Sequence, residues 1–282
     1  MNALQTTDQH KPIIALIIPI INHSFFSNIA DHLTSLAYKN GYLVSVFQSN
    51  EDYQQEVEIV NSIIAQQFAG VIVSISRNTI DSTHFKALQD AGIPLVFIDR
   101  VSEDIIAPKV LINNHEITYK ITESLIKKGN KRIALIIGTN DINVFRERQQ
   151  GYLDALNKYE LIYQMPVVVD DFSIEKGKEI FVKLWSSENR PDAIISSSIH
   201  LTMGILLQTK LYDVKIPHIL NLITYVSHIS FKILQPHITI IDQPENEMVE
   251  SSFDFLEKLI CKQIIPENEM IKIVNAKIAL KN

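Results

Sequence analysis

Short apolar stretches alternate with longer segments of helical periodicity along most of the chain. The first stretch, Ile13–Ile18, has the length of a strand and consists mostly of isoleucine, as suits a buried parallel strand. The next segment, Ser27–Asn40, places Ile29 and Leu33 on one helical stripe, and Gly41 supplies a helix stop. The same criteria predict strands at Leu43–Phe47, Gly70–Ile75 and Leu95–Ile98, and helices at Glu56–Gln67 and Ser82–Ala91.

A second unit repeats this plan. It contains predicted strands at Arg132–Ile137, Val167–Val169 and Asp192–Ser197, and predicted helices at Glu116–Lys128, Arg146–Lys158, Ile174–Trp185 and Leu201–Lys210. Repeated strand–helix–strand units imply right-handed crossovers, so the fold class is α/β with two doubly wound parallel sheets. The alternation then breaks into a strand at Ile238–Ile241, a helix at Glu247–Cys261 and an extended segment at Ile271–Leu280. A tail that returns to complete both sheets accounts for this ending.

Ligands of doubly wound sheets bind beyond the carboxyl ends of the strands. The loops at those ends are therefore the places to search for a site. They are Pro19–Phe26, Ser74–Thr79, Asp99–Glu103, Gly138–Arg148, Ser196–His200 and Thr224–Ser227.

Composition narrows the class of protein. The 282 residues suit two domains, and 46% hydrophobic with 21% charged residues is the balance of a soluble globular protein. The formal charge of −6 argues against a surface that coats nucleic acid or an anionic membrane. Cys261 is the single cysteine, which excludes an intramolecular disulfide and fits a reducing cytoplasm. Neither a signal peptide nor an apolar run of membrane-spanning length is visible, so we expect a cytoplasmic protein.

The motifs of common enzymes are missing. The sequence has no glycine-rich dinucleotide or phosphate loop, no Gly-x-Ser-x-Gly and no His-Glu-x-x-His. Nine histidines are scattered without the spacing of metal ligands, and Cys261 lies in an apolar stretch where an inert thiol is the simpler interpretation. We therefore expect no enzyme activity, no cofactor and no metal.

Six stretches occur in the order and spacing of a known family: IALIIPIINHSFFSNIADHLTSLAYKNGY, AGVIVS, AGIPLVFIDR, ITESLIKKGNKRIALIIG, RQQGYLDAL and ITIIDQP. Together they resemble the effector-binding core of the lactose/galactose-repressor (LacI/GalR) family over Pro12 to about Ile260. The resemblance implies two doubly wound lobes of periplasmic-binding-protein type I, joined by a three-strand hinge. Residues 12–113 and 243–261 would form the N-terminal lobe, and residues 114–242 and 262–282 the C-terminal lobe. Residues 1–11 would be a disordered leader or cut linker.

The resemblance also implies a function. Members of this family are typically homodimers that bind a sugar or related small metabolite between the lobes and thereby modulate DNA binding by an N-terminal helix-turn-helix. Nothing before Pro12 can form that headpiece, so we expect either a truncated chain or a headless sensor, and the polar leader favours truncation. A homodimer would expose apolar residues on the outer faces of helices Ser27–Asn40, Glu56–Gln67 or Leu201–Lys210, unless these residues are all core. The alternative function is a solute-binding protein of a transport system, which would be a monomer with a signal peptide or lipid anchor.

Five ligand-binding candidates follow from the family's cleft positions. Arg148 lies three residues before Gly151 in RQQGY, and its guanidinium could grip a diol or a carboxylate, or could be solvated at a helix start. Phe25 and Phe26 offer one aromatic wall and one staple for the following helix, with Phe25 the preferred wall. Asp99 could accept from ligand hydroxyls or pair with Arg100. Phe172 could be a lid or a simple helix-start residue.

Four further candidates complete the predicted site: Ser76, Ser198, Tyr225 and Gln243. The resembled family carries an Asn-Asp pair where this chain has Ser198 and Ile199, and an aspartate where it has Tyr225. Asn113 likewise replaces an aspartate at the lobe crossover. Lost carboxylates remove strong acceptors for a polyol, so we expect a less acidic site in which Arg148 is less neutralised. Our hypothesis is an anionic or modified sugar, or a less hydroxylated metabolite.

Overall fold

The computed structural model describes residues 11–139, 141–161, 166–226 and 237–279. The predicted leader, apart from Lys11, lies outside these ranges, as do Asn140 and Ser227 of two predicted ligand-side loops. The chain forms two compact units, Met1–Val110 with Asn246–Lys272, and Leu111–Glu245 with Ile273–Asn282. It passes between them three times, and each unit is described by itself.

The first unit is built on a six-stranded sheet in the order β11-β5-β4-β3-β1-β2. Its strands are β1 (Ile13–Ile18), β2 (Leu43–Gln48), β3 (Gly70–Val73), β4 (Leu95–Ile98), β5 (Lys109–Ile112) and β11 (Ile271–Val274). Strand β1 pairs in parallel with β2 on one side and β3 on the other, so the strand order reverses at β1. The central strands β1, β3 and β4 are buried almost throughout because helices cover both faces of the sheet.

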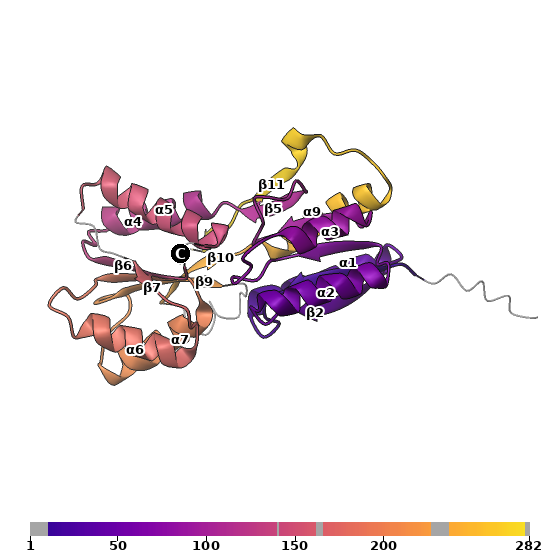
Figure 1. Cartoon of the computed structure of the whole chain (residues 1–282). Helices are drawn as coiled ribbons and strands as arrows, with labels where there is room; N and C mark the ends of the chain where they lie inside the picture. Colours follow the sequence, from indigo (N-terminus) through magenta and orange to yellow (C-terminus); the bar gives the residue numbers. More distant parts are fainter. Residues whose placement is uncertain (1–10, 140, 162–165, 227–236, 280–282) are drawn as a thin grey trace, which may run out of the picture. The chain divides into compact units, whose positions relative to one another are not determined.

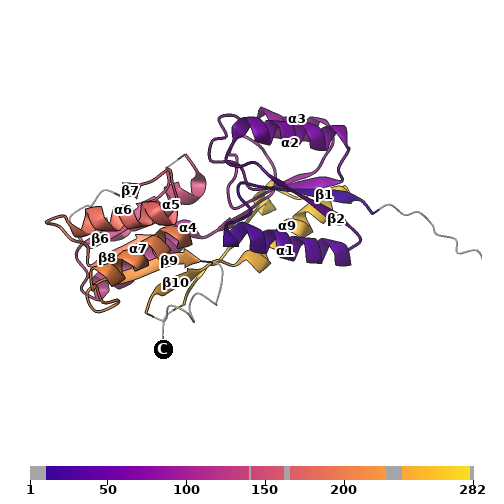
Figure 2. The same ribbon diagram turned by 90° about the horizontal axis from the view of Figure 1, so that it is seen from below.

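Four helices belong to this sheet: α1 (Ser24–Lys39), α2 (Tyr53–Ala65), α3 (Thr83–Asp90) and α9 (Glu245–Ile260). Figure 2 shows α2 and α3 on one face and α1 and α9 on the other. A short 3₁₀ helix, Glu267–Glu269, precedes β11. Gly70 permits the close approach of α9, because a Cβ there would lie 2.7 Å from the Leu256 side chain.

The second unit repeats the architecture with the order β12-β10-β9-β8-β6-β7. Its strands are β6 (Ile133–Ile137), β7 (Val167–Val168), β8 (Ala193–Ser196), β9 (Asn221–Val226), β10 (Thr239–Asp242) and β12 (Lys277–Ala279). All neighbouring pairs are parallel except β10 and β12, which are antiparallel. Helices α4 (Asn114–Lys127) and α5 (Asn143–Lys158) cover one face, and α6 (Ile174–Trp185) and α7 (Ile199–Leu211) the other (Figure 1).

The prediction of two doubly wound parallel sheets is confirmed, and the tail does return to both of them. The predicted division is wrong for residues 262–272, which belong to the first unit. The reason is β11, which extends the first sheet beside β5 through a hydrogen bond from Lys109 N to Met270 O (2.7 Å). The segment between β11 and β12 is held by Asn113, whose Oδ1 accepts a hydrogen bond from Ala276 N (2.9 Å).

Three helices begin three residues earlier than predicted. Helices α1, α2 and α5 start at Ser24, Tyr53 and Asn143, whereas the expected starts were Ser27, Glu56 and Arg146. Phe25 and Phe26 therefore lie in the first turn of a helix, and Arg148 lies in the second turn of α5. Strand β5 was not among the predicted strands, since it is only four residues long.

Candidate functional site

Arg148 is the centre of a polar cluster on the face of the second sheet that α4 and α5 cover. Only 3% of its surface is exposed, so the alternative interpretation as a solvated arginine is wrong. Its Nε donates to Oδ1 of Asn114, the first residue of α4, over 2.8 Å. Helices α4 and α5 pack closely because Gly151 has no side chain: a Cβ there would lie 2.2 Å from the carbonyl oxygen of His115. The glycine of the RQQGY motif therefore helps to place the arginine.

Tyr225 supports Arg148 from β9. The guanidinium carbon lies 3.6 Å from the centroid of the tyrosine ring, which is the geometry of a cation–π interaction. The tyrosine hydroxyl forms a short hydrogen bond with Oγ1 of Thr118, and Thr118 donates its own proton to Asn114 O (2.7 Å). Tyr225 is therefore the donor to Thr118, because a threonine hydroxyl carries only one proton.

Burial keeps that phenol protonated. Desolvation raises the pKa of Tyr225, while the nearby charge of Arg148 and the bond to Thr118 act in the opposite direction. The phenol is thus a neutral donor with an electron-rich ring face at physiological pH. The named partners of Arg148 in this cluster, an amide oxygen and an aromatic ring, are both uncharged.

A second polar group lies on the other face of the same sheet, where α7 begins. Thr202 of α7 donates its hydroxyl to Ser198 O (2.9 Å) and contacts Thr224 Oγ1 of β9 (2.8 Å). Ser196 Oγ also donates to Ser198 O (3.0 Å). The carbonyl of the predicted site residue Ser198 is thus fully used. Its hydroxyl is buried and has no hydrogen-bond partner in the described part of the chain.

Phe172 and Gln243 lie in separate segments of the second unit, after β7 and after β10. Phe172 lies just before the N-cap of α6, and its ring stacks on Phe145 at a centroid distance of 5.7 Å. It also packs against the hydrophobic core. This packing alone explains an aromatic residue at this position, so the role of Phe172 as a lid stays a prediction. Gln243 is buried at the end of β10, where its backbone N–H reaches Val226 O (3.3 Å).

In the first unit, Phe25 and Phe26 are both buried in the first turn of α1. Their rings meet edge to face at a centroid distance of 5.2 Å, and Arg100 lies 5.5 Å above the ring of Phe26. Phe26 is therefore held by the protein's own cation. The assignment of Phe25 as the ligand-facing wall stays a prediction.

Two buried glutamates near the start of α2 hold the predicted ligand-side loop around Ser76. Glu56 accepts from Ser76 N (2.7 Å), from Thr79 Oγ1 (2.6 Å) and from the His84 ring (3.1 Å). Glu51 accepts from Arg77 N (2.8 Å) and forms an ion pair with Arg100 (2.8 Å). Both carboxylates therefore accept hydrogen bonds from the loop that contains Ser76.

Asp99, directly after β4, has an unusual backbone conformation. Its φ of +65° lies in the left-handed region, which non-glycine residues rarely adopt, and the residue is 6% exposed. The following residue, Arg100, forms an ion pair with Glu51. Backbone strain of this kind clusters at functional sites, so Asp99 remains a candidate.

Asn114, Thr118, Glu51 and Glu56 were not predicted. The signal for Glu56 was available: it stands in register with Val60 and Ile63 on the buried stripe of α2, where a charge is out of place. Asn114 and Thr118 are one helical turn apart and share a face. No pattern in the sequence around Asn114 and Thr118 indicates that they contact Arg148 and Tyr225.

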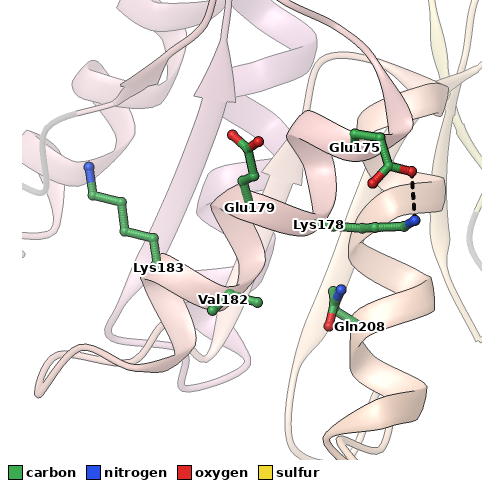
Figure 3. A pocket seen from close by; sticks show the side chains of 6 residues that line it. All are labelled: Glu175, Lys178, Glu179, Val182, Lys183 and Gln208. Atoms are coloured by element: carbon green, nitrogen blue, oxygen red, sulfur yellow. Dashed lines mark hydrogen bonds and ion pairs between the residues drawn. The ribbon is translucent and has the colours of Figure 1, made fainter.

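A groove on the outside of the second unit lies apart from these residues. It is lined by Glu175, Lys178, Glu179, Val182 and Lys183 of α6 and by Gln208 of α7 (Figure 3). Lys178 pairs with Glu175 over 2.7 Å, as exposed residues three apart on a helix commonly do. Among the described residues no group of three or more His, Cys, Asp or Glu is placed to hold a metal ion. No described helix is both long and apolar enough to cross a membrane.

Relatives of known role resemble this chain over most of its length. It is 28% identical over 236 residues to the HTH-type transcriptional repressor CytR of Escherichia coli strain K12, covering 83% of this chain and 69% of that protein. It is 27% identical over 236 residues to the NTD biosynthesis operon regulator NtdR of Bacillus subtilis, covering 83% and 71%.

Solved structures share the fold. The transcription regulator CcpA of Lactococcus lactis superposes with a TM-score of 0.84 at 23% identity, covering 95% of this chain and 97% of that one. A LacI family regulator from Enterococcus faecium with bound ribose gives 0.82 at 20% identity, with the same coverage. The family model for periplasmic binding proteins and the sugar-binding domain of the LacI family matches residues 11–278. The chain therefore belongs to this family of periplasmic binding proteins and LacI sugar-binding domains.

Proposed function

We propose that the chain is the ligand-sensing and dimerisation part of a LacI-type transcriptional regulator. The observation that carries the proposal is the arginine of the RQQGY motif, which is buried and held by Asn114 and Tyr225 on the α4/α5 face of the second sheet. Such a preformed donor suits a small ligand with hydroxyl or acidic groups. The position of that ligand between the two lobes stays a prediction.

Sugars are the ligand class that neighbouring structures favour. Ribose is bound to the Enterococcus faecium regulator, and fructose 1-phosphate to the regulator Cra of Pseudomonas putida. We propose a sugar or related small metabolite here too, bound by Arg148 and by the other predicted residues. No chemistry on the ligand is proposed.

DNA is the second partner in this proposal. Curated relatives are named as HTH-type transcriptional repressors, and this chain covers 69% of the length of CytR. A ligand that stabilises one arrangement of the regulator more than another would shift its affinity for an operator. A regulator of this kind works in the cytoplasm.

A homodimer is supported by α7, which carries apolar residues on its outer side as well as on its buried side. Ile199, Leu201 and Ile205 are buried in the unit, whereas Met203, Leu207 and Leu211 are 42%, 45% and 78% exposed. These three residues repeat every four positions and form one outer stripe. An exposed apolar stripe on a helix is typical of an interaction surface, so we propose that a second copy covers it.

Light scattering tests the dimer. We expect a dimer for the unaltered chain and a monomer for Leu207→Asp/Leu211→Asp, with little change in the melting temperature at low concentration. Lys210→Asp, an exposed change on the same helix, is the control and should remain dimeric. A monomeric unaltered chain would count against the regulator and favour the alternative, a solute-binding protein of a transport system.

A thermal-shift panel tests the ligand class. Sugars, sugar phosphates, uronates and nucleosides are added in turn, because a ligand of the native state raises the melting temperature. We expect at least one sugar or sugar derivative to do so, and Arg148→Met to abolish the shift. Arg146→Met removes an exposed arginine from the same helix and should leave the shift intact. Absence of any shift across the panel would contradict the proposal.

A further inference from the structure

The N-terminus of α7 has an unusual combination of features. The helix is 13 residues long, and its N-cap Ser198 has the extended backbone of a cap (φ −141°, ψ 140°), yet its side chain makes no capping hydrogen bond. No acidic residue lies in the first turn. The positive end of the helix dipole is therefore not balanced by a carboxylate or a capping oxygen from its own first turn.

Two buried hydroxyls at this terminus lack partners. Ser198 is 2% exposed and Ser197 is 8% exposed, and neither Oγ has a hydrogen-bond partner among the residues that the structure describes. In the same unit Ser173, the N-cap of α6, uses its hydroxyl in the ordinary way and accepts from Lys176 N (3.1 Å). Leaving buried hydroxyls unpaired is unfavourable, which indicates that something outside the described contacts satisfies them.

The strand pattern relates this terminus to Arg148. Ser196 is in register with Thr224, and Thr224 contacts Thr202, so both side chains face α7. The ladder continues for one more residue, because Ser197 N donates to Ile136 O (3.0 Å). Alternation along a strand then places Ser197 on the face of Tyr225, which is the face of Arg148.

We propose that an anionic group of the effector, a carboxylate or a phosphate, binds at the N-terminus of α7. The backbone N–H groups of its first turn and the hydroxyls of Ser197 and Ser198 donate to the anion oxygens, and Arg148 supplies positive charge from the neighbouring face of the sheet. These groups can all donate, and helix N-termini favour negative charge, so an anion matches them better than a neutral hydroxyl does. The inference rests on the proposed ligand-sensing function and narrows it to acidic or phosphorylated metabolites.

The first experiment uses inorganic phosphate as the probe. The full chain is titrated with phosphate at constant ionic strength, and the amide resonances of Ile199 and His200 are followed by NMR. We expect saturable shifts with a Kd on the order of millimolar, because one small anion gains only a few hydrogen bonds. Absence of a saturable shift at these amides up to about 50 mM phosphate would overturn the proposal, since binding at this affinity would then be near saturation.

Two aspartate variants form a matched pair. Ser198→Asp places a carboxylate at the N-cap of α7, which should raise the melting temperature without ligand and abolish the phosphate shifts. Ser173→Asp makes the same change at the N-cap of α6 and should leave the phosphate shifts unchanged. Phosphate shifts of the Ile199 and His200 amides that persist in Ser198→Asp would contradict the proposal, because phosphate would then bind at another position.

Matched sugars separate this inference from the proposed function and distinguish the two anions. Ribose, ribose 5-phosphate, glucose, glucose 6-phosphate and glucuronate are compared by thermal shift. Larger shifts for the phosphates or for glucuronate than for the parent sugars, lost in Ser198→Asp, support the inference. Shifts from neutral sugars alone overturn it while leaving the sensing function intact. No response from any compound, phosphate included, contradicts both.

Discussion

The guanidinium of Arg148 lies on the ring of Tyr225, with 3.6 Å between its central carbon and the ring centroid. Asn114 holds the same guanidinium through Nε. Where the resembled family carries a carboxylate, this chain places an aromatic face, which attracts a cation without neutralising it. The following variants test how this cluster holds Arg148.

Arg148→Lys should weaken ligand binding more than it weakens the fold. Lysine keeps the charge, but it has no planar fork and cannot stack on Tyr225 while donating to Asn114. We expect the Kd of the ligand found by thermal shift to rise about tenfold or more, which corresponds to about 1.4 kcal/mol. Isothermal titration measures the change. An unaltered Kd would show that the guanidinium geometry is not used.

Tyr225→Phe isolates the hydroxyl from the ring. The stack under Arg148 survives, and Thr118 keeps its bond to Asn114 O, so the free energy of unfolding should fall by only about 0.5–1.5 kcal/mol. Tyr225→Leu also removes the aromatic face and should cost about 1–2 kcal/mol more. Urea unfolding of both variants measures whether Tyr225→Leu is less stable than Tyr225→Phe. Equal losses would mean that the ring contributes nothing beyond its volume.

Glu56→Gln tests the buried support of the Ser76 loop. The carboxylate accepts from Ser76 N, Thr79 Oγ1 and His84 Nε2, and an amide would turn one of its two oxygens into a donor facing other donors. We expect a loss of about 2–4 kcal/mol in the free energy of unfolding, measured by urea denaturation. Glu58→Gln, an exposed change on the same helix, should stay within about 0.5 kcal/mol.

The framework of the fold could be predicted because it depends on local pattern. Strand Leu95–Ile98 and helix Ile174–Trp185 have the bounds that their apolar runs and caps indicated. Strand β5 could not be recognised in this way, because its pairing with β4 and β11 and not its own periodicity makes it a strand. The start of α1 was missed because Phe25 and Phe26 were assigned to the preceding loop, although they continue the buried stripe of Ile29 and Leu33.

The site could be predicted only in part. Arg148 was found through a family motif, but its supports come from α4 and β9, 34 and 77 positions away along the chain. Such contacts depend on how helices pack on the sheet, and no local spacing encodes them. The unpaired hydroxyl of Ser198 was equally invisible, because serine at an N-cap normally makes its bond within the helix.

Gly204→Ala should destabilise the second unit although alanine is the better helix former. A Cβ at Gly204 would lie 2.1 Å from the carbonyl oxygen of Ile174, which is backbone and cannot move aside as a side chain can. The gain of about 1 kcal/mol in helix propensity is therefore outweighed, and we expect a net loss of about 1–3 kcal/mol. Lys210→Ala on the same helix is the control. A stabilised Gly204→Ala protein in thermal unfolding would contradict the observed packing of α6 on α7.

Glu123 should make the free energy of unfolding decrease as the pH falls into the acid range. Hydrogen bonds from Lys127, Lys158 and Tyr159 lower the pKa of its carboxyl group to about 2 from an ordinary 4.5. A carboxyl whose pKa is depressed by folding contributes its full stabilisation above the ordinary value, and this contribution is lost as the pH falls toward the folded value. The window is therefore pH 4.5 down to about 2.

Glu123→Gln tests that window. The variant should be less stable than the unaltered chain at about pH 6, and the difference should shrink as the pH is lowered through about 4 toward 2, because the unaltered chain then loses the same interaction. High salt should reduce the difference as well, since the partner lysines are more than half exposed. Glu175→Gln removes an exposed pair with a single lysine and controls for the general effect of one lost charge. Urea unfolding at a series of pH values measures both variants. A stability difference that stays constant down to about pH 3 would show that Lys127, Lys158 and Tyr159 do not hold Glu123 as the structure places them.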